Sequence, residues 1–433
     1  MNLDSLKGRA LVALVIMLIS APLSAAEIRL EPDQPLQEVL DNARAGDRIV
    51  LAAGKYQGNF RIEKPLELVG EPGAVLDGGG IDNVLYVDAP GVRVEGLTIR
   101  GSGVNLTDLD SAIFITPEGE GVHIIGNRIE ESASGIWLDS CDNWRVVGNR
   151  ISGRIDLRSQ DRGNGIHLSN THGGYVADNE IWQVRDGIYI ETSDNSTLHA
   201  NEMYDLRYGI HYMYAHDNAV TDNYTHDTRT GYALMQSRRL TVTGNRSERD
   251  QNYGMLLNFI TDSTISRNRV SDARIGTNLA GGDIEGADGK ALFVYNAPYN
   301  EIQGNLLARS DIGIHLTAGS EGNQFWENAF VGNRTQVKYV VNREQEWSRD
   351  GRGNYWSDYL GWDRDADGVG DRPYEPNDAV DALFWRFPLA RMLMNSPAVE
   401  ILRWVQQQFP VLKPQGVRDS YPLMVPPEFV EIR

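Results

Sequence analysis

The chain has 433 residues and a formal net charge of −19 at pH 7. A surface this acidic repels nucleic acid and anionic lipid, so neither is an expected partner. The single cysteine, Cys141, excludes an internal disulfide. No Walker-type Gly-Lys-Ser/Thr element occurs, so any ATP use would belong to another protein.

Residues 1–26 have the pattern of a secretory signal peptide. A short positive region precedes an apolar run from Ala10 to Ile19, and the small residues Ser24-Ala25-Ala26 end it. This predicts cleavage after Ala26 and export to the periplasm. The alternative is an uncleaved membrane anchor, for which the run is short, because a span needs about 20 residues. We expect no transmembrane segment in the mature chain, which would begin near Glu27.

The first elements of the mature chain resemble a cap. Pro35 to Ala43 has the apolar spacing of a short amphipathic helix, and Arg48 to Ala52 reads as a strand. We expect both to cover the start of the repeat that follows, because the first coil of a solenoid otherwise exposes its core and an open edge.

An asparagine recurs along the chain with a step of about 22 residues, which is typical of a solenoid. Two longer steps hold insertions, around Gly153–Gly163 and Gly276–Lys290. We expect the asparagines to stack as a hydrogen-bonded ladder and to take the left-handed conformation that a coil corner requires. The series is Asn127, Asn149, Asn179, Asn201, Asn223, Asn245, Asn268, Asn305 and Asn328.

A Gly-Ile type pair opens a strand in most coils. Ile166 and Leu168 then alternate with His167 and Ser169, and this period of two predicts a strand with one inward and one outward face. Cys141 falls in a column of small inward residues, so we predict a buried structural thiol rather than a reactive or metal-binding one. We expect His167 to have a surface or turn role.

Together these coils predict an all-β fold, a right-handed parallel β-helix over residues 27–340 with an N-terminal helical cap. The asparagine series ends near Asn333, and beyond it the composition shifts towards Trp, Pro and Asp. We therefore place a domain boundary near Val341, followed by a mixed, partly helical C-terminal segment over residues 341–433.

Two outward positions of the central coils carry soft metal ligands. Met213 and Met235 occupy the same position of successive coils, about 4.8 Å apart, and His211 precedes Met213 on the same face. Thioether and imidazole ligands suit Cu(I), so these three residues are candidate copper ligands, and His216 and His226 at nearby turns could complete the site. A protein-binding patch without metal, or ordinary packing, are the alternatives.

The stretch from Asp363 to Asp371 matches the first nine positions of a calcium-binding loop. Its candidate ligands are Asp363, Asp365, Asp367, Asp371 and the carbonyl of Val369, with Gly368 at the sharp turn. The twelfth position is Tyr374 rather than Glu, so this is not a standard EF-hand. The alternative is a metal-free acidic turn.

The last part of the chain has an apolar helix. Ser396-Pro397 is a good helix start, and Ile401, Leu402, Val405 and Phe409 share one face. With the apolar stretch before it, this segment either folds back as a cap or docks on a membrane protein. Met392 and Met394 are a second candidate copper pair.

The repeat, residues 207–216 (RYGIHYMYAH), residues 353–359 (GNYWSDY), the acidic loop and Pro388–Met394 resemble the NosD family, within the pectin-lyase-like β-helix superfamily. The resemblance covers the mature chain. It implies an accessory protein at the periplasmic side of the inner membrane that receives copper and helps assemble the copper centre of nitrous oxide reductase. The implied partners are an ABC transporter permease and ATPase, a periplasmic copper chaperone and the reductase.

We therefore expect a non-enzymatic copper-handling protein. The alternatives are a polysaccharide lyase or C5-epimerase on the same fold, or a metal-free scaffold. Glu191 and Asp139 would supply carboxylates for an enzyme, but Met213 and Met235 occupy the middle of the face where a sugar site should be polar.

Overall fold

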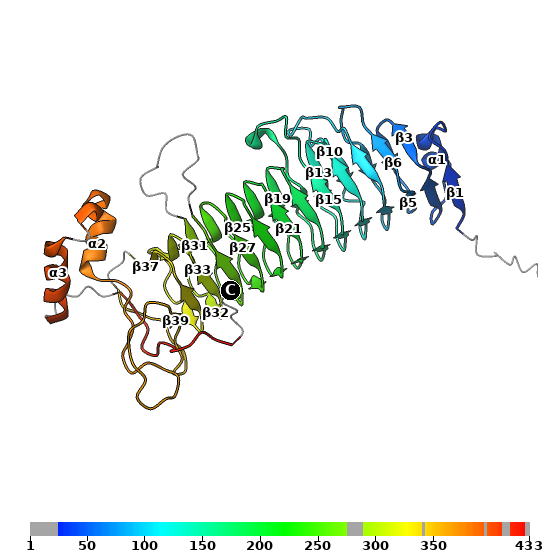
Figure 1. Ribbon diagram of the computed structural model, residues 1–433. Helices are drawn as coiled ribbons and strands as arrows, with labels where there is room; N and C mark the ends of the chain where they lie inside the picture. The colour runs from blue at the N-terminus through cyan, green and yellow to red at the C-terminus, as the bar shows by residue number, and fades with distance from the viewer. Residues whose placement is uncertain (1–24, 275–288, 340–342, 394–395, 409–415, 429–433) are drawn as a thin grey trace, which may run out of the picture.

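The computed structural model describes residues 25–274, 289–339, 343–393, 396–408 and 416–428. The signal-peptide prediction therefore lies almost wholly outside the described residues. The chain winds into a right-handed parallel β-helix, which confirms the predicted fold class (Figure 1). Three parallel sheets run along the solenoid, and each typical coil contributes one strand to each sheet.

The strands of the three sheets follow one another in a fixed cycle. Sheet 1 contains β1 (Glu27–Leu30), β2 (Arg48–Leu51), β5 (Glu67–Gly70), β8 (Arg93–Glu95), β11 (His123–Ile125), β14 (Arg145–Val147), β17 (Tyr175–Ala177), β20 (Thr197–His199), β23 (Ala219–Thr221), β26 (Thr241–Thr243), β29 (Thr264–Ser266), β32 (Glu301–Gln303) and β35 (Gln324–Trp326). Sheet 2 contains β3 (Gly54–Gln57), β6 (Ala74–Asp77), β9 (Thr98–Arg100), β12 (Arg128–Glu130), β15 (Arg150–Ser152), β18 (Glu180–Trp182), β21 (Glu202–Tyr204), β24 (Tyr224–His226), β27 (Arg246–Glu248), β30 (Arg269–Ser271), β33 (Leu306–Ala308), β36 (Ala329–Val331) and β39 (Tyr355–Trp356). Sheet 3 contains β4 (Phe60–Ile62), β7 (Leu85–Val87), β10 (Ser111–Ile115), β13 (Ser134–Asp139), β16 (Ile166–Ser169), β19 (Asp186–Glu191), β22 (Tyr208–Met213), β25 (Thr230–Met235), β28 (Tyr253–Asn258), β31 (Lys290–Tyr295), β34 (Ile312–Leu316) and β37 (Thr335–Tyr339).

The core lies between the three sheets and follows the predicted alternation. In β22, Ile210 and Tyr212 point inward and are fully buried, whereas His211 and Met213 point outward and are only partly covered. Each inward side chain stacks on its counterpart in the next coil, as Ile210 does on Tyr232. Full burial of such an apolar side chain is worth about 1.5–3 kcal/mol, so the stacked columns provide the main stabilisation.

The asparagine ladder is present and continues one coil further than predicted. Asn201 Nδ2 donates to Asn223 Oδ1 at 2.9 Å, and the same bond repeats up to Asn328 and Asn354 at 2.9 Å. The expectation that the asparagines themselves are left-handed is wrong. The positive φ belongs to the residue before them, as at Ala200 (52°) and Asp222 (56°), because the asparagine must keep its side chain directed into the ladder.

Both ends of the solenoid are covered. At the N-terminus, α1 (Leu36–Asn42) buries Leu36 and Leu40 beside β4, close to the predicted helix. At the C-terminus, β39 joins sheet 2 from beyond the predicted boundary near Val341, and β38 (Gln345–Glu346) pairs with β40 (Val417–Arg418). Part of the tail therefore serves as the C-terminal cap.

The C-terminal cap is an aromatic stack fixed by one buried carboxylate. Trp356 stacks on Phe330 with ring centroids 4.2 Å apart, and Trp347 stacks on Phe325 at 4.0 Å. Asp419 accepts hydrogen bonds from Trp356 Nε1 at 2.8 Å and from the Asn354 backbone N–H at 2.7 Å. The last asparagine of the ladder is thus tied to the returning chain.

The remaining helices form a separate group beyond the end of the solenoid (Figure 1). They are α2 (Ala379–Arg386), the 3₁₀ helix η2 (Pro388–Leu393) and α3 (Pro397–Gln408), while a further 3₁₀ turn, η1 (Ser159–Asp161), lies in the first insertion. Val380, Phe384 and Val399 form a small core between α2 and α3.

Cys141 is buried, as predicted. Burial raises the pKa of its thiol to about 12. A thiol with this pKa stays protonated at neutral pH and is a poor nucleophile and metal ligand, so its role is packing.

A carboxylate lies fully buried inside the solenoid, at the corner between β27 of sheet 2 and β28 of sheet 3. Asp250 accepts hydrogen bonds from Ser247 Oγ at 2.6 Å, Thr228 Oγ1 at 2.7 Å and Thr225 Oγ1 at 3.1 Å. Loss of solvent nevertheless outweighs these bonds and raises the pKa of Asp250 to about 6. The folded protein therefore carries a penalty for the ionised form.

We predict that Asp250→Asn raises the melting temperature at pH 8 more than at pH 4.5. The folded-state pKa lies above the unfolded value of about 3.9, so this group's destabilising contribution grows as pH rises from about 4 to about 6 and is then complete. The difference between variant and wild type in the free energy of unfolding should increase by about 2–3 kcal/mol as this carboxyl group ionises. Thermal melting of the wild type and the variant between pH 4.5 and pH 8 measures this difference. Asp262→Asn, at an exposed turn, is the control. A difference that stays constant with pH would refute the prediction.

Candidate metal-binding face and acidic loop

The three candidate copper ligands lie on the outer face of sheet 3. Parallel pairing of β22 with β25 sets Met213 directly opposite Met235, and both side chains are partly exposed. His211 lies two residues before Met213, with Tyr189 on one side and Ala233 on the other. The structure therefore brings these three residues onto adjacent strands of one face.

The imidazole of His211 is held by the preceding coil. Its Nδ1 lies 3.1 Å from Asp186 Oδ2, and Arg207 binds the same carboxylate with two hydrogen bonds. Because Nδ1 is used in this contact, a metal ion would bind His211 at Nε2. Neither Asp186 nor Arg207 was among the predicted site residues.

A column of rings leads along the outer face to His211. Ring centroids of neighbouring members lie 3.6–6.5 Å apart, and the methyl group of Ala233 takes the next place in the series. Ala233 is fully buried, so the side chains around it close over this smaller position. The ring column consists of Tyr86, Phe114, Trp137, His167, Tyr189 and His211.

Polar groups lie beside the methionines in the same column. Glu191 is the register partner of Met213, and Asn258 is that of Met235. Glu191 also lies 3.2 Å from His167 Nε2, and this contact lowers the pKa of the Glu191 carboxyl group. The surface role expected for His167 is wrong, because its side chain is buried between Trp137 and Tyr189.

The two further histidines differ in position. His216 follows β22 at a turn, as expected. His226, which was expected at a turn near the site, belongs to β24 on the outer face of sheet 2, where its Nδ1 lies 2.7 Å from Asp227. It faces another side of the solenoid because each coil corner redirects the following strand, and it does not join the His211 group.

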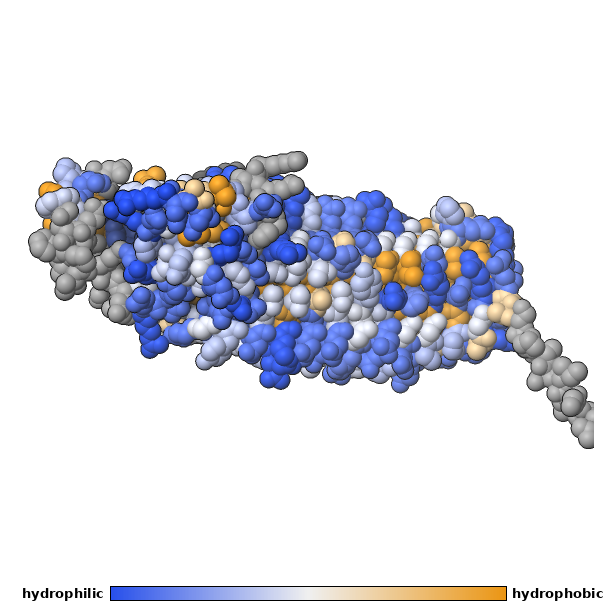
Figure 2. Space-filling model, turned by 90° about the horizontal axis from the view of Figure 1, so that it is seen from below, coloured by the Kyte–Doolittle hydropathy of each residue, from blue (hydrophilic) through white to orange (hydrophobic). Residues whose placement is uncertain are grey.

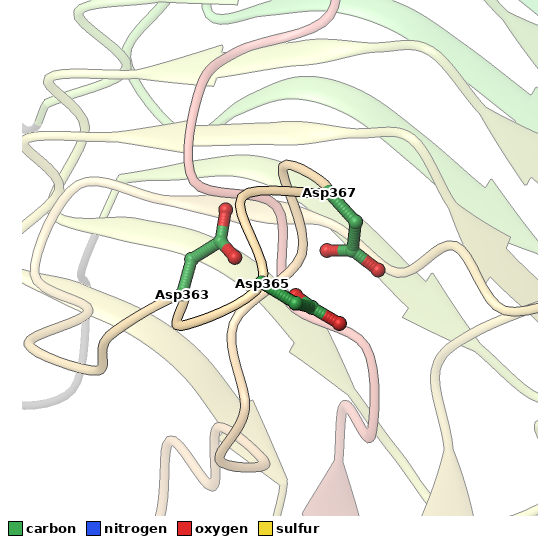
Figure 3. A group of neighbouring side chains, drawn as sticks. All are labelled: Asp363, Asp365 and Asp367. Atoms are coloured by element: carbon green, nitrogen blue, oxygen red, sulfur yellow. The ribbon is translucent and has the colours of Figure 1, made fainter.

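The acidic loop has the backbone form of a cation-binding turn. The Gly368 N–H donates to Asp363 Oδ2 at 2.9 Å, and Gly368 has a φ of +84°. Single carboxylate oxygens of Asp363, Asp365 and Asp367 lie within 4.8 Å of one another, projecting from one turn (Figure 3). The charge of Asp367 raises the pKa of Asp365, a repulsion that a bound cation would relieve.

The other positions of the loop are fixed by hydrogen bonds. Asp371 Oδ2 accepts from the Arg364 N–H at 3.0 Å, and the Val369 N–H donates to Asp367 Oδ1 at 2.8 Å. Tyr374, at the twelfth position, stacks on Trp356, and its hydroxyl donates to Asp358. Tyr374 therefore belongs to the C-terminal cap and does not supply the bidentate carboxylate of an EF-hand.

The fold and the candidate site together define a parallel β-helix protein whose outer face carries soft metal ligands. The family model described as "Periplasmic copper-binding protein (NosD)" matches residues 147–361. A Pseudomonas aeruginosa protein named "Probable ABC transporter binding protein NosD" is 59% identical over 423 residues, which is 97% of this chain and 96% of that protein. A Stutzerimonas stutzeri protein of the same name is 57% identical over 405 residues, 94% of this chain and 90% of that protein.

The chain belongs to the NosD family, a family of periplasmic proteins. These relatives are named binding proteins, in agreement with the expectation that the chain is not an enzyme. The A-module of a mannuronan C-5 epimerase, AlgE6 of Azotobacter vinelandii, has a similar structure with a TM-score of 0.60, covering 75% of this chain and 94% of that one. At 14% identity, this likeness shows the fold alone.

None of the helices within the described ranges has the length and apolar character that a membrane crossing requires. The outward-facing residues seen from below are mostly hydrophilic, with hydrophobic residues in small groups (Figure 2).

We predict that millimolar Ca²⁺ raises the melting temperature of the chelator-treated mature chain, because a ligand bound only by the native state stabilises it. The gain should reach about 2.7 kcal/mol when free Ca²⁺ is 100 times its Kd. Asp365→Ala with Asp367→Ala should abolish it. The control is Glu118→Ala with Glu120→Ala, an exposed acidic pair of equal spacing. If Ca²⁺ does not change the melting temperature of the wild type, the loop is a metal-free turn.

Proposed function

We propose that this chain is a periplasmic copper-handling protein that accepts Cu(I) at His211, Met213 and Met235. It passes the ion towards assembly of the copper centre of nitrous oxide reductase, and it works while associated with an ABC transporter. The observation that supports the copper site is the register of β22 and β25, in which Met213 and Met235 are direct neighbours beside His211. The description of the family as copper-binding agrees with it.

The chemistry of these side chains favours Cu(I) over other ions. Two thioethers and one imidazole are soft or intermediate ligands, which suit Cu(I) and bind Ca²⁺ and Mg²⁺ poorly. All three side chains are partly accessible on an open sheet. A donor or acceptor protein can therefore reach the ion directly, and a site with few neutral ligands can release it again.

The helices beyond the solenoid are the surface that we assign to the transporter. Several of their apolar side chains are exposed to solvent, and water would be released if a partner buried them. Both relatives are named ABC transporter binding proteins, which agrees with this role. The exposed residues are Leu383, Leu389, Met392, Leu393, Ile401, Leu402 and Trp404.

The second candidate copper pair has less support. Met392 is among the exposed residues of this helical surface, whereas Met394 and Phe409 lie outside the described residues. The sheet 3 face is therefore the copper site of this proposal.

We predict that Met213→Leu with Met235→Leu lowers the Cu(I) affinity of the mature chain at least tenfold while the fold persists. Leucine keeps volume and hydrophobicity, and Met-to-Leu exchanges usually cost less than about 1.5 kcal/mol. Anaerobic competition with a chromophoric Cu(I) chelator measures the affinity, and circular dichroism checks the fold. Met255→Leu, at an inward position of the next coil, is the matched control. If the double variant binds Cu(I) as tightly as the wild type, the site lies elsewhere.

We predict that Ile401→Asp with Trp404→Asp weakens association with the ABC transporter at least tenfold and leaves Cu(I) affinity unchanged. The two side chains are exposed on α3, so the change should spare the small helical core and act on the docking surface. Binding of the purified chain to the detergent-solubilised transporter measures the effect. Ile81→Asp with Ile155→Asp, two side chains that are each 70% exposed on the N-terminal coils, is the control. Equal loss in both double variants would argue against docking through α3.

A further inference from the structure

A buried carboxylate links an arginine to the candidate copper ligand His211. Asp186 Oδ1 accepts from Arg207 Nε at 2.8 Å, and Oδ2 accepts from the Arg207 terminal nitrogen at 2.5 Å. The same Oδ2 lies 3.1 Å from His211 Nδ1. The Asp186 side chain is only 1% exposed and that of His211 12%, so the whole contact is shielded from water.

This arrangement fixes the position of the imidazole proton. An ionised carboxylate only accepts hydrogen bonds, and a guanidinium only donates them. The contact between Asp186 and His211 therefore requires the proton to reside on Nδ1. In the neutral ring, Nε2 then carries the free electron pair, which is the form that binds a metal ion.

Aromatic neighbours fix the plane of the same ring. Tyr189 lies on one side of His211 with a centroid distance of 4.7 Å, and Tyr208 meets it edge-on at 4.9 Å. The Arg207 guanidinium lies 4.5 Å from the Tyr208 ring centroid, so the arginine is fixed as well. Tyr208 is also the register partner of Asp186, which ties the group to two adjacent coils.

We propose that Asp186 and Arg207 are positioning residues that present Nε2 of His211 to Cu(I). This inference rests on the proposed copper-handling function. Arg207 neutralises and orients the buried carboxylate, and Asp186 sets the tautomer and direction of the imidazole. Replacing a hydrogen-bond partner of a metal-bound histidine typically weakens metal affinity 10- to 100-fold.

The chain contains a similar but more exposed arrangement that lacks soft ligands, with 45% of the Asp227 side chain accessible against 1% for Asp186. On sheet 2, Arg249 binds Asp227 through two hydrogen bonds of 2.9 and 2.7 Å, and Asp227 Oδ2 lies 2.7 Å from His226 Nδ1. The neighbouring outward residues there are tyrosines, glutamates and Arg246 rather than methionines. Asp227→Asn therefore removes the same kind of contact without touching the proposed site.

The test is Asp186→Asn in the mature chain, with two measurements. An amide has a single acceptor oxygen and no negative charge, so it cannot bind Arg207 at both positions and no longer attracts a proton to His211 Nδ1 as a carboxylate does. We expect a Cu(I) affinity at least tenfold weaker than wild type in anaerobic chelator competition. In the copper-free protein, ¹⁵N NMR of labelled histidines should show His211 leaving the Nδ1–H tautomer, with His211→Gln used for assignment.

Two further variants complete the test. Arg207→Gln should lower Cu(I) affinity in the same direction but less, and Asp227→Asn should leave it unchanged. If Asp186→Asn keeps wild-type affinity while Met213→Leu with Met235→Leu loses it, the positioning role is overturned and the copper face remains. If neither variant loses affinity, the copper face is overturned and the positioning role with it. An equal loss in Asp227→Asn would also overturn the specific role of Asp186.

Discussion

The parallel, in-register stacking of successive coils determines which side chains reach the surface together. Backbone hydrogen bonds fix the spacing between coils, and the asparagine ladder repeats the same register at one corner from Asn127 to Asn354. A shift by one residue would turn the outward set of a strand inward, because side chains alternate along it. In β22 that shift would bury His211 and Met213 and expose Ile210 and Tyr212. The outer face of sheet 3 is therefore fixed by the burial of the inner one.

The same stacking leaves the core and the strand edges open at each end of the solenoid, and the chain covers the two ends differently. At the N-terminus a short helix is enough, because Leu36 and Leu40 cover the first coil. At the C-terminus the chain passes the end of the solenoid and returns more than 60 residues later, so that Asp419 bonds Asn354 and Trp356. The helices between these two passes lie outside the cap, and many of their apolar side chains outside the small core of Val380, Phe384 and Val399 remain exposed.

The sequence was most informative where a feature repeats with the coil. The asparagine spacing, the alternation after each Gly and the small residue at Cys141 all predicted the observed β-helix, and position counting alone placed Met213 beside Met235. Features at the corners and between columns were harder to predict. The left-handed residue is the one before each asparagine, and His226 points to another sheet, because corner geometry depends on backbone angles that spacing does not reveal.

Contacts made across coils were also missed. Asp186 precedes its partner His211 by 25 residues and occupies a different, buried position in its coil, so no local motif connects them. Aligning the residue before each Gly would have singled out Asp186, but only the structure shows that Arg207 neutralises it. The extension of the ladder to Asn354 was not predicted for a similar reason. The last asparagine of the ladder is held by a segment that returns from the C-terminal tail.

In the proposed function, the rigidity of the solenoid separates two tasks. Four coil steps lead from β25 to β37, which at about 4.8 Å each amounts to about 20 Å. A copper donor or acceptor at the sheet 3 face would thus meet a surface held well away from the helices assigned to the transporter. Because stacked coils bend little, a displacement of the helical end would carry the metal face with it as one body. The β-helix suits this task because it joins an open, accessible binding face to a distant docking surface through a rigid core.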